Sequence, residues 1–193
     1  MKVGVLALQG DFAAHARALV RAGAEPRLVR TPAELAEVDA LVLPGGESTA
    51  MLKGIERDGL EPALRAFLAS GRPVLGTCAG AILLAREIVG SHQRSLGALD
   101  IAIERNAYGT QLDSFVCTAE TDDPISELAG LECVLIRAPR IVRAGPGVTV
   151  RARVKGEPAL VSTGPVWAAT FHPEMTDDPR VQRAWLRSAA APA

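Results

Sequence analysis

The chain has 193 residues, of which 48% are hydrophobic, and its formal net charge at pH 7 is −1. This length and composition suffice for one substantial core, so we expect a single domain over residues 1–193. The near balance of 21 basic and 22 acidic residues provides no electrostatic footprint for nucleic acid or a membrane surface, which leaves small solutes and proteins as the expected partners.

The first residues and the cysteines indicate in which cellular compartment the protein is expected. Gln9 and Asp11 interrupt the apolar stretch near the start too early for a signal peptide or a transmembrane span. The three cysteines have irregular spacing and no CxxC pair, which argues against both a disulfide framework and a zinc site. We therefore expect a cytoplasmic protein without a metal site.

The first half of the chain alternates apolar runs with helical patterns. Strands are expected at 3–8, 26–30, 39–43 and 73–76. Helices are expected at 11–22, from the Thr31 capping box onward, at 61–70 and at 79–89. In the first helix, the spacing places Phe12, Ala16, Leu19 and Val20 on the buried face. Strands that are apolar on both faces and alternate with helices predict a three-layer, flavodoxin-like α/β fold with a mostly parallel sheet.

The second half has a different pattern. Short strands separated by turn residues are expected at 101–104, 114–118, 134–136, 148–154, 159–162 and 166–171. They form either an antiparallel extension of the sheet or a second small sheet. A last helix is expected to begin after Asp178 and Pro179.

Cys78 lies in the segment GTCAG (76–80), between an expected strand and an expected helix. A helix that starts just after the cysteine favours the reactive thiolate, and the segment resembles a nucleophile elbow in which the N–H of Ala79 is an oxyanion donor. Gly76 and Gly80 permit a tight backbone and the approach of a substrate. Free cysteine also packs well in cores, so the pentapeptide alone leaves both interpretations open.

A nucleophile needs a base, and the chain contains three histidines. His15 falls on the polar side of the first helix and His92 in a polar loop, so both are expected on the solvated surface. His172 follows an apolar strand and precedes Pro173 and Glu174. Residues two apart in an extended chain project to the same side, so the Glu174 carboxylate can fix the tautomer of His172. Combined with the cysteine turn, this pair favours a nucleophile, base and orienting carboxylate.

The segment LPGGESTAM (43–51) is another glycine turn after a strand. Gly45 and Gly46 can offer amides to an anion or oxyanion, and Ser48 and Thr49 can cap the next helix. The ending of a P-loop is absent, and taken alone the segment is best interpreted as a plain strand-to-helix turn.

Six segments together resemble the class I (triad) glutamine amidotransferases. In chain order they read LALQGD, PGGEST, GTCAG, ERNAYG, IRAP and FHPE. GTCAG and HPE are typical of the superfamily. The other four, with DSF after ERNAYG, are most similar to the glutaminase subunit of the two-subunit pyridoxal 5′-phosphate synthase. The resemblance runs in order from Leu6 to Asp177.

The resemblance implies a reaction and roles for named residues. Cys78 attacks the side-chain amide of L-glutamine, His172 transfers the proton, and Glu174 orients His172. The amides of Gly46 and Ala79 form the oxyanion hole. No metal or organic cofactor is required, and the ammonia passes to a separate synthase barrel subunit.

The resemblance also implies a glutamine-binding set: Gly46, Glu47, Ser48, Arg105, Ile136 and Arg137. Read without the family, Arg105 and Arg137 are more simply surface arginines. Gln9 and Gly10 lie where relatives meet the synthase subunit, which implies a partner-dependent role near the oxyanion hole.

Three alternatives remain at this point. A stress or deglycase-type protein of similar fold also has a cysteine elbow, but it lacks the His-Pro-Glu segment that contains Glu174. A catalytically silent binding module would use Cys78 only for packing. A glutaminase subunit for another ammonia acceptor is a further possibility, against which LALQGD and ERNAYG weigh.

Overall fold

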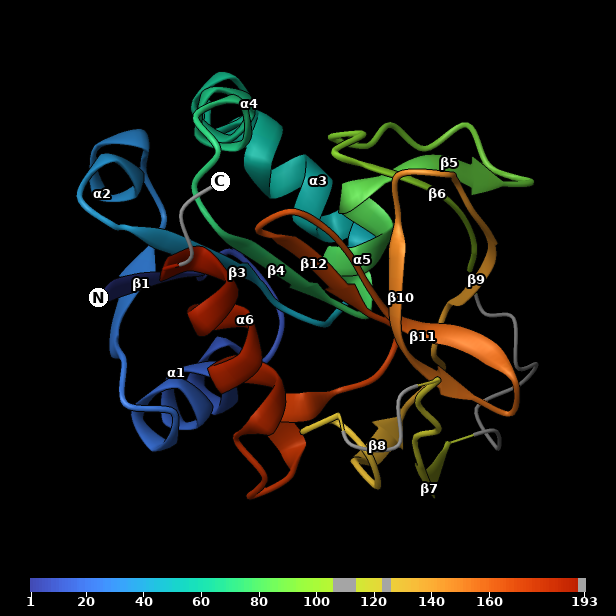
Figure 1. Cartoon of the computed structure of the whole chain (residues 1–193). Helices are drawn as coiled ribbons and strands as arrows, with labels where there is room; N and C mark the ends of the chain where they lie inside the picture. The colour runs from blue at the N-terminus through green and yellow to red at the C-terminus, as the bar shows by residue number, and fades with distance from the viewer. Residues whose placement is uncertain (106–113, 123–125, 191–193) are drawn as a thin grey trace.

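Seven strands form the central sheet of the computed structural model, which describes residues 1–105, 114–122 and 126–190 (Figure 1). Their spatial order is β2 (Glu25–Val29), β1 (Lys2–Leu6), β3 (Ala40–Leu43), β4 (Val74–Thr77), β12 (Val166–Ala169), β11 (Glu157–Thr163) and β10 (Thr149–Val154). The first five strands are parallel, in the flavodoxin-like order, and the last two extend the sheet in antiparallel fashion. The predicted fold class is therefore confirmed.

Helices cover both faces of this sheet (Figure 1). One face packs against α2 (Pro32–Ala36), α3 (Ser48–Arg57), α4 (Glu61–Ala69) and α5 (Ala79–Leu84). The other face packs against α1 (Phe12–Arg21) and α6 (Arg180–Ala190). Along β3, Leu41 and Leu43 belong to the first cluster, whereas Ala40 and Val42 belong to the second. Burial on both faces explains why this strand is apolar at every position.

The remaining strands form two small sheets beside the central one. One consists of β5 (Ala85–Val89), β6 (Leu99–Glu104) and β9 (Arg140–Ala144), and the other of β7 (Phe115–Thr118) and β8 (Glu132–Leu135). The sequence left open whether the second half extends the sheet or forms a small one, and the structure does both. The strands β5 and β9 have no counterpart among the strands expected from the sequence.

The helix expected over 79–89 is wrong in its second half. It ends at Leu84, and Ala85 already has extended backbone angles (φ −65°, ψ 145°). The residues that follow form β5, in which Ile88 pairs with Ile103 of β6. The apolar run suits either a helix or a strand, and pairing with β6 decides the outcome.

The buried face of α1 also differs from the prediction. The buried residues are Ala14, His15, Ala18 and Leu19, while Val20 is 61% exposed. Alanines lie on several sides of this helix, so apolar spacing does not single out one face. The observed rotation places His15 in the interior, where the sequence predicted a solvated surface.

Helix starts agree in part with the expectations. The Thr31 capping box of α2 is present, with Glu34 as its partner. The cap of α3 is Glu47, rather than Ser48 or Thr49. Its carboxylate accepts hydrogen bonds from the backbone N–H groups of Thr49 at 3.0 Å and Ala50 at 2.7 Å. A glutamate is an unusual N-cap, and its extended backbone (φ −100°, ψ 115°) allows it here.

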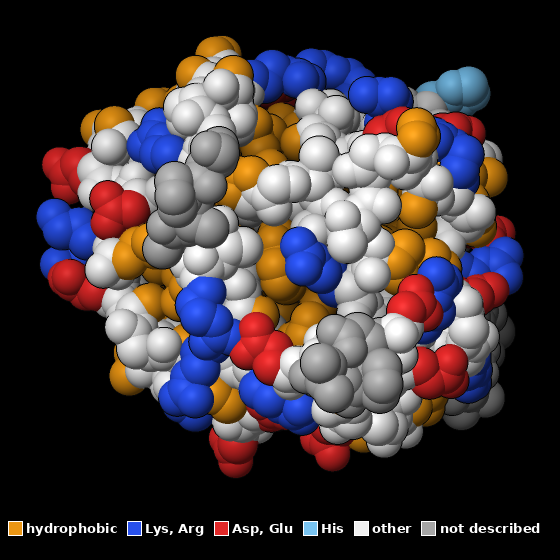
Figure 2. Space-filling view, in the orientation of Figure 1, with side chains coloured by type: hydrophobic (Ala, Val, Ile, Leu, Met, Phe, Trp, Pro, Cys, Tyr) orange, Lys and Arg blue, Asp and Glu red, His pale blue; other side chains and the backbone are white. Residues whose placement is uncertain are grey.

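The surface agrees with the nearly neutral net charge. Basic and acidic side chains lie interspersed along the lower edge and right side of the face in Figure 2, so no patch of one sign extends over all of it. In the part of the chain that the structure describes, no helix is both long and apolar enough to span a lipid bilayer.

Candidate active site

Cys78 lies at the turn between β4 and α5, as predicted. Its backbone angles are φ 47° and ψ −102°, which non-glycine residues rarely adopt. Its N–H donates a hydrogen bond to the carbonyl oxygen of Ala169 at 2.8 Å, so β12 holds the turn in place. A strained strand-to-helix turn that presents a side chain at the end of a parallel sheet is the geometry of a nucleophile elbow.

Gly76 and Gly80 are required by packing around this turn. A Cβ at Gly76 would lie 2.6 Å from the backbone of Gly80, and one at Gly80 would collide with the backbone of Leu43. The two glycines therefore let α5 approach β4 and β3 closely. The expectation that they also permit the approach of a substrate stays a prediction.

His172 and Glu174 make the contact that their spacing predicted. Nδ1 of His172 lies 2.7 Å from Oε1 of Glu174. Glu174 reaches this position through the 3₁₀ turn η1 (Pro173–Met175), not through an extended chain. The backbone N–H of His172 donates to the carbonyl oxygen of Val134 at 2.9 Å, which fixes the segment against β8.

The electrostatics of His172 follow from its neighbours. Burial acts to lower its pKa, but interactions with the Cys78 thiol and the Glu174 carboxylate outweigh it and raise the pKa to about 10. The imidazole is therefore a strong proton acceptor next to the cysteine.

Glu174 has a second imidazole partner that the sequence did not predict. Nε2 of His15 lies 3.2 Å from Oε1 of Glu174, and both side chains are only 1% exposed. Burial acts to raise the pKa of Glu174, but His15 and His172 together lower it to about 2. The carboxylate is thus ionised at neutral pH. The expectation of a solvated His15 is wrong, whereas His92 is exposed as predicted.

Two glycine loops meet beside Cys78. A Cβ on Gly10 would collide with the carbonyl of Gly45, and one on Gly46 would collide with the side chain of Gln9. Oε1 of Gln9 accepts a hydrogen bond from the backbone N–H of Glu47 at 3.0 Å. The loop that contains Gln9 and Gly10 therefore touches the loop expected to form the oxyanion hole.

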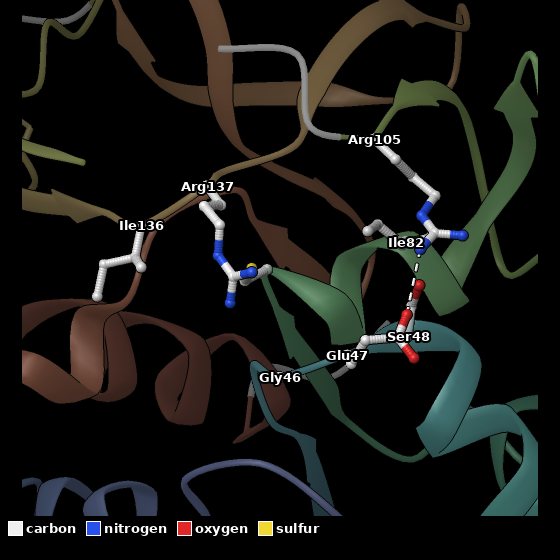
Figure 3. A pocket seen from close by; sticks show the side chains of 8 residues that line it. Gly46, Glu47, Ser48, Ile82, Arg105, Ile136 and Arg137 are labelled. Carbon is white, nitrogen blue, oxygen red and sulfur yellow. Dashed lines mark hydrogen bonds and ion pairs between the residues drawn. The ribbon is translucent and has the colours of Figure 1, made fainter. Parts of the chain in front are cut away.

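The residues expected to bind glutamine line one pocket (Figure 3). Its lining consists of Gly46, Glu47, Ser48, Cys78, Ile82, Arg105, Ile136 and Arg137. Arg105 and Arg137 reach into it from different segments. Arg137 has a φ of 45°, so its backbone is strained where its side chain enters the pocket. A neighbouring hollow shares Cys78 with this pocket and adds Gln9, His172 and Glu174.

Charged and polar groups are organised inside this pocket. Nη2 of Arg105 lies 3.1 Å from Oε1 of Glu47. Burial acts to raise the pKa of Glu47, but the two amides it caps, the Thr49 hydroxyl and Arg105 together lower it. Gln93, which belongs to no motif of the sequence, accepts hydrogen bonds from both Ser48 and Arg105. Its place in a polar loop gave no local signal for this role.

The structure describes two of the sequence motifs only in part. Residues 106–109 of ERNAYG, and Asp113 of DSF, lie outside the described residues. Within residues 1–105, 114–122 and 126–190, no group of three or more His, Cys, Asp or Glu side chains is placed to hold a metal ion.

Comparisons with known proteins add to this geometry. The model of the SNO glutamine amidotransferase family matches residues 5–190. A protein of Koribacter versatilis (strain Ellin345) named pyridoxal 5′-phosphate synthase subunit PdxT is 51% identical over 187 residues, which are 97% of this chain and 95% of that protein. A protein of the same name from Thermotoga neapolitana is 45% identical over 186 residues, 96% of this chain and 98% of the relative.

Solved structures agree with the sequence relatives. A crystal structure of a glutamine amidotransferase superposes with a TM-score of 0.90 at 46% identity, over 98% of this chain and 99% of that one. The structure of PurLQS from Thermotoga maritima has a TM-score of 0.67 at 20% identity, over 96% of this chain and 97% of that one. The second likeness is one of fold alone.

Proposed function

The chain belongs to the SNO glutamine amidotransferase family, and we propose that it hydrolyses L-glutamine to L-glutamate and ammonia, with Cys78 as nucleophile. The observation that carries this proposal is the 2.7 Å contact of His172 with Glu174, beside a cysteine on a strained elbow. A base that is itself oriented by a carboxylate is what a thiol nucleophile needs.

The pocket suits the amino-acid end of glutamine. We assign the α-amino group to the Glu47 carboxylate and the α-carboxylate to Arg105 and Arg137, because a zwitterion needs charges of both signs around it. Burial acts to raise the pKa of Glu47, but the capped amides, the Thr49 hydroxyl and Arg105 lower it, and its carboxylate supplies the negative charge. Gly46, Ser48 and Ile136 complete the lining of the pocket.

The first half-reaction forms a thioester. Nε2 of His172 holds the proton of the Cys78 thiol, since Nδ1 faces Glu174, and Sγ of Cys78 bonds to the side-chain carbonyl carbon of glutamine. The carbonyl oxygen becomes an oxyanion, stabilised by the amides of Gly46 and Ala79. His172 then gives its proton to the amide nitrogen, the C–N bond breaks, and ammonia leaves a γ-glutamyl thioester.

The second half-reaction consumes one water. His172 takes a proton from the water, whose oxygen bonds to the thioester carbon. The same oxyanion site stabilises the intermediate, the C–S bond breaks, and the proton returns to the sulfur of Cys78. The products are L-glutamate and the regenerated thiol, so each turnover requires no metal or organic cofactor.

The ammonia serves a second subunit. The relatives are named as subunits of pyridoxal 5′-phosphate synthase, so we propose that a synthase barrel subunit of that enzyme receives the ammonia. We propose that Gln9 and Gly10 act at the interface with that subunit, where docking would influence the Gly46 loop that their own loop touches. We place the reaction in the cytoplasm, where the three free cysteines stay reduced.

The test is glutamate release from L-glutamine by the purified chain, with and without the barrel subunit. Cys78→Ala is the key variant, and Cys117→Ala is its control because that cysteine lies on β7, outside the pocket. We expect the barrel to raise the rate, Cys78→Ala to abolish it and Cys117→Ala to retain it. If Cys78 matters but the barrel changes nothing, the partner is wrong. If glutamine is not hydrolysed under either condition, the glutaminase proposal fails.

A further inference from the structure

One oxygen of Glu174 contacts two imidazoles. Oε1 lies 2.7 Å from Nδ1 of His172 and 3.2 Å from Nε2 of His15. The other oxygen, Oε2, is buried and has no hydrogen-bond partner in the described part of the chain. Because a buried carboxylate depends on its hydrogen bonds for both charge and orientation, His15 is one of two imidazoles that hold Glu174.

The geometry also fixes the tautomer of His15. An ionised carboxylate only accepts hydrogen bonds, so Nε2 of His15 must carry a proton at 3.2 Å from Oε1. The same Nε2 lies 3.1 Å from Oγ1 of Thr77, a residue that is 0% exposed and directly precedes Cys78. One imidazole on α1 therefore contacts both the carboxylate and the strand end that presents the nucleophile.

We propose that His15 is a positioning residue of this active site, which donates a hydrogen bond from Nε2 to Glu174 and so sets the orientation of His172 toward Cys78. This inference rests on the proposed glutaminase function for its meaning in the reaction. It extends the arrangement from three side chains to four, with the fourth on the helix that follows the Gln9 and Gly10 loop.

The surrounding charges allow this role. His172 contacts Glu174 directly, and both residues line a hollow together with Cys78 and Asp11. A second hollow that Glu174 lines contains the ionisable residues Asp11, Arg17, Arg21 and Asp177. Asp11 caps α1, Arg17 and Arg21 lie on α1, and Asp177 follows η1. In contrast, His15 itself is only 1% exposed, so its hydrogen bond to Glu174 is shielded from solvent.

Two variants test whether His15 acts as a hydrogen-bond donor or only fills space in the core. His15→Leu fills the space without a donor, whereas His15→Gln places an amide N–H near the position of Nε2. We expect kcat for glutamine hydrolysis in the presence of the barrel subunit to fall roughly tenfold in His15→Leu and to stay within about threefold in His15→Gln. KM should change less than about twofold, because the glutamine pocket lies on other elements. The exposed His92→Leu is the matched control.

A second readout does not depend on glutamine hydrolysis. The alkylation rate of Cys78 by iodoacetamide is followed against pH in the free chain, with the Cys78 peptide quantified by mass spectrometry. When Glu174 loses the hydrogen bond from His15, its carboxylate stabilises the imidazolium of His172 less. A smaller fraction of Cys78 is then thiolate at a given pH. We expect the midpoint to move up by about one pH unit in His15→Leu, to stay near wild type in His15→Gln and in His92→Leu, and to move up in Glu174→Gln.

The outcomes distinguish this inference from the proposed function. If the chain hydrolyses no glutamine but shows the alkylation shift, the proposed role of His15 stands and the glutaminase proposal fails. An unshifted midpoint in His15→Leu, or equal defects in His15→Leu and His15→Gln, overturns the inference. If His15→Leu does not fold, ¹⁵N NMR of the wild-type imidazoles decides. We expect Nε2 of His15 to be protonated at neutral pH, and an unprotonated Nε2 overturns the inference.

Discussion

Gln93 accepts a hydrogen bond from Nη1 of Arg105 at 2.6 Å through its side-chain carbonyl oxygen. The same oxygen accepts from the hydroxyl groups of Ser48 at 3.1 Å and Thr49 at 3.3 Å. Since Arg105 also pairs with Glu47 at 3.1 Å, Gln93 holds one end of the charged pair that we assign to the amino-acid end of glutamine. A single loop residue thus organises groups from α3 and from the end of β6.

We expect Gln93→Ala to weaken glutamine binding. Losing one hydrogen bond to a charged group costs about 1.5 kcal/mol, which corresponds to roughly a tenfold rise in KM. The kcat should stay within about twofold, because Gln93 has no contact with Cys78 or His172 among the described interactions. Initial rates over a range of glutamine concentrations test this, with the exposed neighbour His92→Ala as control. A fall in kcat at unchanged KM would contradict the assignment.

Gly80→Ala tests the close packing of α5. Helix propensity alone would make this change stabilising by about 1 kcal/mol. The new Cβ would, however, collide with the backbone of Leu43, with the carbonyl carbon only 2.8 Å away. Overpacking of this kind costs about 1–3 kcal/mol, so we expect a net loss of stability in urea unfolding and lower activity, because Cys78 is displaced. Gly147→Ala, whose Cβ would meet nothing within 4 Å, is the control. A gain of stability in Gly80→Ala would show that α5 can move away from β3.

The fold could be predicted to the extent that local pattern determines it. The strand β3 is apolar at each position because both its faces are covered, and the sequence shows this directly. The boundary at Leu84 could not be predicted, because pairing of Ile88 with Ile103 decides it. Likewise, the orientation of α1 depends on which of its alanine-rich sides the sheet and η1 cover.

The site was predictable where a motif contains the contact. Glu174 lies two residues from His172, so the sequence carries that pair. His15 lies 62 residues from Thr77, and Gln93 lies 45 residues from Ser48. Such contacts depend on the tertiary fold, and a buried histidine in a helix gives the same local pattern as an exposed one.

Gln9 provides a test of the partner interface. Its Oε1 accepts the backbone N–H of Glu47 at 3.0 Å and lies against Gly46. Gln9→Met keeps the length of the side chain but removes this acceptor, so the Gly46 loop loses a contact that fixes its backbone. Because the Gly46 amide is also the proposed oxyanion donor of the free chain, we expect the slower activity of that chain to fall as well, but the stimulation by the barrel subunit to fall further, by roughly tenfold. The ratio of the two rates is the measurement. Equal losses in both rates would assign Gln9 to the chemistry of the free chain instead of docking.

The two perturbed groups of the site predict how stability depends on pH. The pKa of His172 is raised from 6.5 to about 10. Its contribution to the free energy of unfolding is therefore fully present below pH 6.5 and is lost as the pH rises toward 10. The pKa of Glu174 is lowered from 4.5 to about 2. Its contribution is present above pH 4.5 and is lost as the pH falls toward 2. We therefore expect the wild-type free energy of unfolding to be highest between about pH 4.5 and 6.5 as far as these two groups determine it.

His172→Gln separates the alkaline part of this dependence. The amide does not titrate, so the decrease in unfolding free energy between pH 6.5 and 10 should become shallower than in the wild type. Urea unfolding at pH 6, 8 and 10 measures the slope, and His92→Gln is the control because that side chain is exposed. If the slopes of His172→Gln and the wild type coincide, then His172 binds its proton no more tightly in the folded chain than in the unfolded one. In that case the support that Cys78 and Glu174 give to the imidazolium is absent from the free chain and must arise when substrate or the barrel subunit binds.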